Sequence, residues 1–213
     1  MKRKKIILTV IMLGLTVLSL WGEQMRKMTA REIEALRKNV VESAGSFVGK
    51  RALSVKGETF SYDCSGLMMA IMKANNISIF EKQAVKIKGA NGVKIMFDTL
   101  KQYNKIFRSF LNLKEGDFIF FHNTYDKNRN RRVDDLFTHI AMAVDIQKDG
   151  TIKYVHKSSR GIEYGYMNLR LPHKDRYKDG VKNSYLRSKK SGDSRNVKYL
   201  SGELFGYFGT IFR

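Results

Sequence analysis

The sequence predicts an α+β domain in which helices cover one face of an antiparallel sheet. Two observations lead to this fold class: apolar residues recur at helical intervals early in the chain, and short alternating or apolar runs follow in its later part. Helical segments followed by strands with short turns are typical of an α+β arrangement. With 213 residues, of which 43% are apolar, the chain is long enough for one compact domain with extensions.

The N-terminus has the order of an export signal. A basic stretch, Lys2 to Lys5, precedes an uncharged and mostly apolar run from Ile6 to Trp21. In Leu20-Trp21-Gly22 a small residue stands only at the last position, so this stretch is a poor match to the small-residue cleavage site of a signal peptide. We therefore expect an exported protein, periplasmic or extracellular, in which residues 1–22 are either a cleaved signal peptide or an uncleaved anchor. As an anchor, residues 6–21 would hold the chain in the inner membrane and make its only membrane contact.

The first element after this leader is a helical segment, residues 23–44. Thr29 to Glu32 has the spacing of a capping box, which predicts a helix from about Ala30 to Gly45. Apolar residues follow the helical period and predict that the helix packs on the core: Ile33, Leu36, Val40, Ala44 and Phe47.

A second helix opens the domain proper, residues 45–213. After an expected loop from Gly49 to Gly57, Asp63 has the place of an N-cap, so the helix begins at Cys64. Its apolar residues include several methionines, which we expect in the core.

Strands are expected in the later part of the chain, because the apolar period changes there. The predicted strands are Phe118–Phe121, Thr138–Ile146, Thr151–Lys157 and Leu204–Phe212. Two other segments lack such a pattern: an inserted loop at 123–137 and a basic, solvated excursion at 173–198.

The charge of the chain predicts an anionic partner. It carries 40 Lys and Arg against 20 Asp and Glu, a formal net charge of +20. The charge alone does not say whether this partner is a nucleic acid, a membrane surface or an acidic polymer. Export argues against nucleic acid, and together with the family resemblance given below the expected partner is peptidoglycan or another anionic polymer of the cell envelope. We expect a monomer.

The chain has a single cysteine, Cys64, far from the leader, which excludes a lipoprotein. In an exported protein a lone thiol is either buried and inert or a working group. At the first turn of a helix, unpaired backbone N–H groups and the helix dipole favour the thiolate. Cys64 is therefore a candidate nucleophile, whose own backbone N–H would stabilise an oxyanion.

His139 is the candidate base for this thiol. On its strand His139 shares a face with Ala141 and Ala143, while larger residues occupy the other face. The small residues leave room for a helix, and we expect the helix that begins at Cys64 to lie there.

His156 is the candidate third member. A four-residue hairpin loop would pair Ile146 with Thr151 and set Ser158 opposite His139, with His156 as the diagonal neighbour of His139. His156 would then accept the Nδ1 proton of His139 and so hold the other ring nitrogen of His139 towards the thiol. A two-residue turn would move His156 one rung away. The alternative is that both histidines are ordinary strand residues.

Four sequence blocks together resemble the NlpC and protein-60 family of papain-like cell-wall peptidases. They are Asp63-Cys64-Ser65-Gly66-Leu67, Glu115-Gly116-Asp117-Phe118-Ile119-Phe120-Phe121, Thr138-His139-Ile140-Ala141-Met142 and Tyr154-Val155-His156-Lys157-Ser158. The resemblance covers about Gly45 to Tyr164. It implies a papain-like fold and a triad of Cys64, His139 and His156. It also implies an endopeptidase acting on peptidoglycan stem peptides, often beside a D-glutamyl residue.

The chain departs from this family ahead of the cysteine. Family members usually have a Tyr and paired glycines there, and the Tyr assists the oxyanion region. Here Arg51-Ala52-Leu53-Ser54 occupies that stretch, with Tyr62 as a candidate substitute. Asp63 and Ser65 are further candidates for the oxyanion or substrate-binding region.

The inserted loop carries part of a calcium-binding pattern. Its candidate ligands are Asp126, Asn128, Asn130 and Asp134. Arg131 replaces the usual glycine and Phe137 the bidentate acid, so a calcium site and a polar, solvated loop both remain open. The proposed hydrolysis requires no cofactor. His122 and His173 are expected bystanders, and no zinc site is expected because no close His or Cys pair is present.

These features predict an exported cysteine hydrolase that works through an acyl-enzyme. The preferred reaction is cleavage of peptide bonds in peptidoglycan stems. The alternatives are an amidase or (thio)esterase with the same triad, and a catalytically idle wall-binding module.

Overall fold

The fold is that of a computed structural model, which describes residues 28–81, 91–178 and 180–212. The predicted export signal, residues 1–22, lies outside these residues. In the part of the chain that is described, no helix is both long and apolar enough to cross a membrane.

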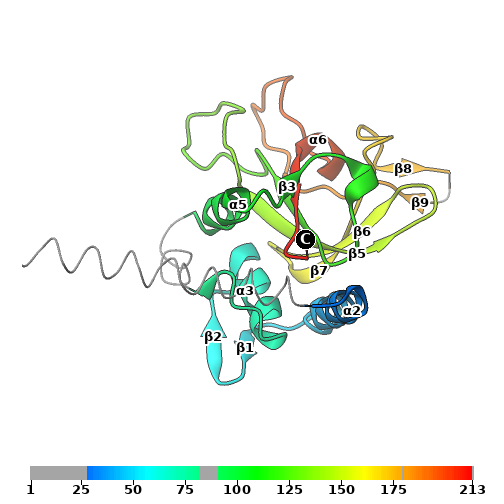
Figure 1. Cartoon of the computed structure of the whole chain (residues 1–213). Coiled ribbons are helices and arrows are strands. Elements are labelled where there is room, and N and C mark those ends of the chain that lie inside the picture. The colour runs from blue at the N-terminus through cyan, green and yellow to red at the C-terminus, as the bar shows by residue number, and fades with distance from the viewer. Residues whose placement is uncertain (1–27, 82–90, 179, 213) are drawn as a thin grey trace, which may run out of the picture.

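A six-stranded antiparallel sheet forms the centre of the fold (Figure 1). Its strands lie in the order β3-β10-β4-β5-β6-β7, with the bounds Ile106–Phe107, Phe205–Gly209, Phe118–Phe121, His139–Ile146, Ile152–Ser158 and Gly161–Met167. Two short ribbons lie outside it: β1 (Leu53–Val55) with β2 (Glu58–Phe60), and β8 (Arg176–Tyr177) with β9 (Gly180–Val181). β1 falls in the stretch that we predicted to be a loop, so that prediction is wrong.

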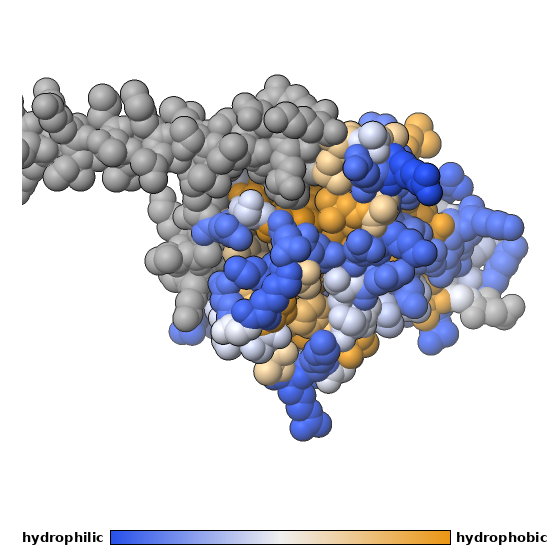
Figure 2. Space-filling view, turned by 60° about the horizontal axis from the view of Figure 1, so that its bottom comes forward, coloured by the Kyte–Doolittle hydropathy of each residue, from blue (hydrophilic) through white to orange (hydrophobic). Residues whose placement is uncertain are grey.

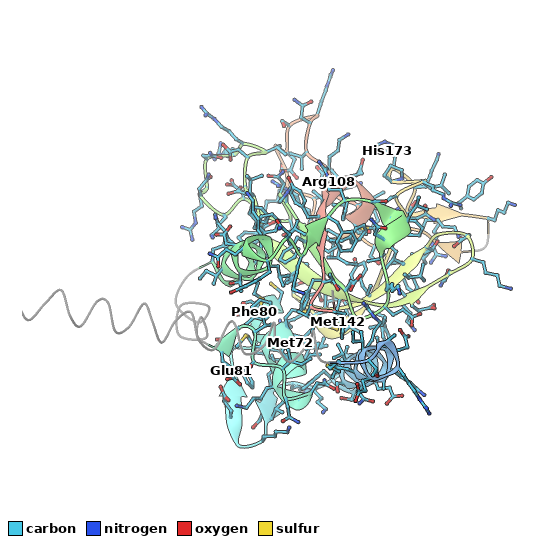
Figure 3. All side chains as sticks on the ribbon, in the orientation of Figure 1. Met72, Phe80, Glu81, Arg108, Met142 and His173 are labelled. Carbon is cyan, nitrogen blue, oxygen red and sulfur yellow. The ribbon has the colours of Figure 1, made fainter. Side chains whose placement is uncertain are left out.

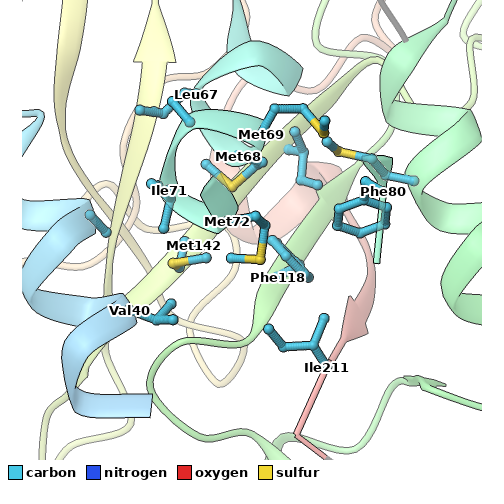
Figure 4. Packing of buried hydrophobic residues seen from close by; sticks show 14 of the residues in the cluster. Val40, Leu67, Met68, Met69, Ile71, Met72, Phe80, Phe118, Met142 and Ile211 are labelled. Carbon is cyan, nitrogen blue, oxygen red and sulfur yellow. The ribbon is translucent and has the colours of Figure 1, made fainter. Parts of the chain in front are cut away.

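Three helices pack on one face of the sheet: α2 (Ala30–Ser46), α3 (Cys64–Ala74) and α5 (Gly92–Gln102) (Figure 1). The buried core between helices and sheet brings Met68 and Met72 of α3 against Phe118 of β4 and Met142 of β5 (Figure 4). The methionines of α3 thus belong to the core, as we predicted. The predicted α+β, papain-like class, with helices on an antiparallel sheet, is confirmed.

The other face of the sheet has its own apolar cluster, which includes Ala141, Tyr154 and Phe208. The short helix α6 (Ser201–Leu204) and the 3-10 turn η2 (Phe110–Asn112) contribute Leu204 and Phe110 to it. The last predicted strand, Leu204–Phe212, is a strand only over Phe205–Gly209. Leu204 ends the short helix α6, and residues 210–212 follow the strand without strand structure.

The helix α3 lies on the face opposite to the one that we predicted. Its Leu67 and Met68 pack with Ile140 and Met142, whereas Ala141 belongs to the cluster on the other face. Apolar clusters cover both faces of β5, and on the face of Ala141 and Ala143 the cluster contains large aromatic residues such as Phe208 instead of the helix.

The β5–β6 hairpin has the predicted register beside the histidines but not at its turn. Ile146 pairs with Ile152, and not with Thr151 as predicted. An irregularity between Ala143 and Asp145 shifts the register, so that Met142 pairs with Val155. Such a bulge adds one residue to one strand and restores the expected alignment further along the hairpin.

The basic excursion at 173–198 is anchored at several points. Asn183 is 1% exposed, and its amide Nδ2 donates to the carbonyls of Leu171 and Lys174. Arg187 is 7% exposed and donates to the carbonyl of Asn123. Residues 188–192 are exposed, and Figure 2 shows hydrophilic residues over much of the described surface of one face. The segment is therefore solvated only in part.

Candidate active site

The start of helix α3 is fixed by Asp63. The Asp63 carboxylate accepts hydrogen bonds from the backbone N–H of Gly66 at 2.8 Å and from the hydroxyl of Ser65 at 2.7 Å. At Gly66 a side chain has no room, since a Cβ atom would lie 1.9 Å from the carbonyl oxygen of Ser61. The Asp-Cys-Ser-Gly sequence thus closes the first helical turn tightly and places Cys64 at its beginning.

The thiol of Cys64 is half-buried and lies beside the first residues of β5. Burial raises the pKa of Cys64 to about 11, and the negative charge of Asp63 adds to this effect. Hydrogen bonds from the backbone of Ile140, Ser65 and Cys64 itself lower the pKa, but by less. The helix start therefore favours the thiolate as we predicted, yet desolvation outweighs it and leaves a neutral thiol at rest.

His139 and His156 are in direct contact. Nε2 of His139 lies 2.9 Å from Nδ1 of His156, and the two rings stand edge to face with their centroids 5.1 Å apart. We predicted that Nδ1 of His139 would make this bond, and that is wrong. The ring is turned so that Nε2 faces His156 on the neighbouring strand, and Nδ1 of His139 is left for other partners.

Both imidazoles are held neutral. Burial lowers the pKa of His139 well below its usual value, and the charges of His156 and Lys157 lower it further. Burial, with the charges of Arg160 and Lys157, lowers the pKa of His156 to about 4. With both rings neutral, a proton on Nε2 of His139 can be donated to Nδ1 of His156, which leaves Nδ1 of His139 as a free acceptor.

Glu163 stands behind His156, although the sequence analysis did not single it out. It is the register partner of His156 on β7, and its Oε1 lies 3.9 Å from Nε2 of His156. The Arg160 guanidinium binds both Glu163 carboxylate oxygens, at 2.8 and 3.2 Å. Glu163 could have been found from the sequence. Pairing the residues on the two sides of the turn before Gly161 sets Glu163 opposite His156, and this pairing spans only a few residues of the chain.

The three candidates around the thiol have partners within the fold. The hydroxyl of Tyr62 donates to the carbonyl of Lys50 at 2.6 Å, and the Lys157 ammonium lies 4.6 Å from the centre of the Tyr62 ring. The side chains of Asp63 and Ser65 bond each other at the helix start. An oxyanion or substrate-binding role for Tyr62, Asp63 and Ser65 stays a prediction.

A pocket of about 660 Å³ opens beside the two histidines. His139 and His156 line it together with the β6–β7 turn, the loop at 124–126 and the segment 185–190. Tyr125, a lining residue that the sequence analysis missed, lies close enough to Cys64 for the cysteine's charge to raise the pKa of Tyr125, although burial is the larger cause. Cys64 itself is not among the residues that line the pocket.

The four predicted calcium ligands come together in the inserted loop. The carboxylate of Asp134 accepts hydrogen bonds from the amides of Asn128 and Asn130, and Asp126 accepts from the backbone N–H of Asn130 and Arg131. Arg131 adopts a φ of +61°, the conformation that usually requires glycine. Within the described residues, no group of three or more His, Cys, Asp or Glu is arranged to hold a metal ion. Calcium stays a prediction.

The other two histidines lie apart from the pair. His122 accepts a hydrogen bond from the backbone N–H of Phe137 at 2.9 Å, and so braces the end of the inserted loop. His173 is paired with Glu203 at 2.9 Å on the periphery of the molecule, well separated from Met142 of β5 (Figure 3). Neither residue lines the pocket beside His139.

Comparison with known proteins gives one match. The model of the family described as NlpC/P60 family matches residues 49–181, a span that includes Cys64, His139 and His156. No curated protein and no solved structure matches the chain.

Proposed function

Because this chain belongs to the NlpC/P60 family, whose members are cysteine hydrolases of the cell-wall peptidase kind, we propose that it is an exported endopeptidase of peptidoglycan stem peptides. The observation that carries the proposal is the 2.9 Å contact between His139 and His156. It lies at the start of β5, where the backbone of Ile140 forms a hydrogen bond with the thiol of Cys64. A thiol, a base and a group that orients the base are the parts that acyl transfer through a cysteine needs.

In the first step the neutral thiol of Cys64 loses its proton as it attacks the carbonyl carbon. Nδ1 of His139 takes the proton, so His139 works as a general base and no resting ion pair is required. His156 accepts the Nε2 proton of His139 and thereby holds the ring in the tautomer whose Nδ1 is free.

In the second step the C–N bond of the tetrahedral intermediate breaks. The imidazolium of His139 gives its proton to the leaving amine, and the acyl group remains on the sulfur of Cys64. Water then attacks the thioester with His139 again as base, which releases the acid product and restores the thiol.

The backbone N–H of Cys64 is the proposed donor to the oxyanion. It belongs to the first turn of α3, where backbone N–H groups have no carbonyl partner within the helix, and in the resting structure it is directed at the cysteine's own sulfur. A donor fixed in this way costs little reorganisation when negative charge develops on the carbonyl oxygen.

The experiment uses purified peptidoglycan and the chain without residues 1–22. We expect muropeptide fragments whose masses identify a cut within the stem peptide, and we expect Cys64→Ala to abolish their release. A cut between sugar and peptide would make the enzyme an amidase. Equal release by wild type and Cys64→Ala would contradict the proposal, and binding to peptidoglycan without any release would indicate a wall-binding module.

A further inference from the structure

Two loops lie side by side at one end of the molecule. The first is the inserted loop at 123–137, drawn in green at the top of Figure 1, and the second is the segment 185–198, drawn there in orange. Arg187 joins them, because its guanidinium donates to the carbonyl of Asn123 at 2.9 Å. The second loop lies beyond residue 181, where the family match ends. We call the exposed side of these two loops the two-loop surface.

The two-loop surface is basic. The two loops together carry nine Lys and Arg against four Asp, which gives nine minus four, a formal net charge of +5. Exposed cations attract anions over about one Debye length, ~8 Å at physiological salt. Seven of the nine cations are exposed and form no ion pair with an Asp or Glu within residues 28–81, 91–178 and 180–212: Lys127, Arg129, Arg131, Arg132, Lys189, Lys190 and Arg195.

The four acids of the two loops are engaged within the loops. Asp126 accepts backbone N–H groups of the inserted loop, and Asp134 accepts side-chain amides of the same loop. Asp193 accepts from the backbone of the second loop and from the hydroxyl of Tyr199. Asp135 is buried, with 6% of its surface exposed. The acids thus hold the loops in shape, and the exposed cations are left for a partner.

The inserted loop is closed at its base. Asn123 and Asp135 exchange two hydrogen bonds, both of 2.7 Å: the N–H of Asn123 donates to the carbonyl of Asp135, and the N–H of Asp135 donates to the side-chain oxygen of Asn123. The hydroxyl of Thr138 accepts from the N–H of Thr124 at 2.9 Å. A loop held in this way loses little conformational entropy when a partner binds.

The arrangement of the cations favours a linear phosphate polymer. Four of the seven are arginines, whose forked donors bind phosphate oxygens in pairs. The cations are spread over two loops, so a partner that meets them all carries its charges at intervals along its length.

A membrane and a nucleic acid fit the two-loop surface less well. Both loops line the pocket beside His139, so a flat membrane pressed on them would cover that pocket. A nucleic acid uses exposed aromatic rings on which its bases stack. The exposed rings of the two loops, Tyr125 and Tyr185, line the pocket instead.

We propose that the two-loop surface is a docking site for a linear phosphodiester polymer that carries no nucleobases. In an exported protein such a site would keep the enzyme attached to the cell envelope while the pocket remains open. The proposal concerns binding and not cleavage, so it goes beyond the proposed function and is tested separately from it.

The test measures binding of fluorescently labelled poly(glycerol phosphate) to the full chain by anisotropy, over a range of salt concentrations. We expect saturable binding that weakens as salt rises, because bound cations release the counterions of the polymer. Two triple variants each remove three exposed cations, one triple from each loop. They are Arg129→Gln with Arg131→Gln and Arg132→Gln, and Lys189→Gln with Lys190→Gln and Arg195→Gln.

Each triple variant should bind the polymer at least about tenfold more weakly than wild type. The slope of log K against log salt should become shallower by about 2, since each lost phosphate contact contributes about 0.7. The substituted side chains are exposed, so the unfolding temperature should stay at the wild-type value. If one triple variant does not fold, the other still tests the proposal.

The matched control removes three exposed cations elsewhere: Arg31→Gln and Lys38→Gln on α2, and Lys148→Gln in the β5–β6 turn. In Figure 1 α2 lies at the lower end of the molecule, away from the two loops. The control should keep most of the wild-type affinity. An equal loss in the control, or no binding of the polymer by wild type, would overturn the docking site.

Two further ligands test the other macromolecules. Single-stranded DNA with the same number of phosphates should bind no more tightly than poly(glycerol phosphate), and a gain of tenfold or more would assign the surface to nucleic acid, because stacking adds about 1–3 kcal/mol per base. Vesicles of phosphatidylglycerol with phosphatidylcholine are compared with phosphatidylcholine alone, so that any effect of residues 1–22 is common to both. Charge-dependent vesicle binding that the triple variants abolish, without polymer binding, would assign the surface to a membrane and overturn the proposal.

Discussion

Nε2 of His139 lies 2.9 Å from Nδ1 of His156, so one of these two nitrogens donates a hydrogen bond and the other accepts it. His139 is the first residue of β5, and His156 lies near the end of β6, 4% exposed. In this arrangement His156 acts on the reaction only through His139. It is a positioning residue, and its removal should affect the chemical step more than substrate binding.

The first prediction concerns His156. Replacing it with Ala removes the acceptor of the Nε2 proton and frees the tautomer of His139, so kcat should fall by about 10²-fold with little change in KM. His156→Asn keeps a hydrogen-bond acceptor and should restore part of the loss. Steady-state kinetics on a stem peptide measures both values. A rise in KM at unchanged kcat would contradict the positioning role.

The second prediction concerns acid stability. The folded-state pKa of His156, about 4, lies below its usual value of 6.5, so the unfolded chain binds the proton more readily. Stability from this burial is present above pH 6.5 and is lost as the pH falls towards 4, by about 3 kcal/mol. Urea unfolding at pH 7 and pH 4 should show a smaller pH effect in His156→Gln than in wild type. The exposed Lys148→Gln serves as the control and should retain the wild-type pH effect.

The third prediction concerns the thiol. Burial raises the pKa of Cys64 to about 11, so the free enzyme holds a protonated thiol at neutral pH. The rate of iodoacetamide labelling should therefore keep rising through the alkaline range, beyond the usual thiol pKa of ~8.5. Because the chain has a single cysteine, labelling reports this site alone. A plateau reached below pH 7 would indicate a preformed thiolate and imidazolium pair instead.

The fourth prediction concerns the attachment of α2. Arg37 of α2 pairs with the fully buried Asp117 at 2.9 Å, donates to the carbonyl of Glu115, and lies 4.1 Å from the centre of the Phe212 ring. Arg37→Ala leaves Asp117 buried without its partner and should lower the free energy of unfolding by about 3–5 kcal/mol. Urea denaturation measures the change. Lys38→Ala, on the exposed face of the same helix, should change stability by less than about 1 kcal/mol; equal effects would show that α2 is only loosely attached.

The fifth prediction concerns calcium. If the inserted loop binds the ion, titration of the purified chain at millimolar calcium should give heat that Asp134→Asn greatly weakens, because that carboxylate is in contact with two other candidate ligands. The loop leads directly into His139, so binding should also raise the unfolding temperature. The absence of heat at millimolar calcium would leave the polar-loop alternative.

The parts of the site that sequence analysis predicted depend on local geometry. Asp63 and Cys64 lie at a helix start, which the sequence marks by a capping residue and apolar spacing, and the structure has the same start. His139 and His156 meet because strand alternation has a period of two. The prediction failed at the hairpin turn, because the register shifts at a bulge near Val144 that the alternation of the sequence does not indicate.

The parts that were missed depend on contacts between distant segments. Arg187 reaches the carbonyl of Asn123, 64 residues earlier in the chain. Glu163 is the exception: it lies beside His156 on the adjacent strand β7, and it was missed because β7 was not predicted. The orientation of the His139 ring is likewise set by tertiary packing, since either nitrogen could face His156 in the same register. The thiol pKa could not be predicted either, because the burial that raises it comes from the folded chain.

The central claim is that Cys64 carries the acyl group during hydrolysis. The most direct measurement is the intact mass of the enzyme after acid quenching during turnover of a stem peptide, followed by peptide mapping. We expect a mass increase equal to the acyl fragment, located on Cys64 and absent in Cys64→Ala. Turnover without any adduct on Cys64, together with undiminished cleavage by Cys64→Ala, would contradict the claim.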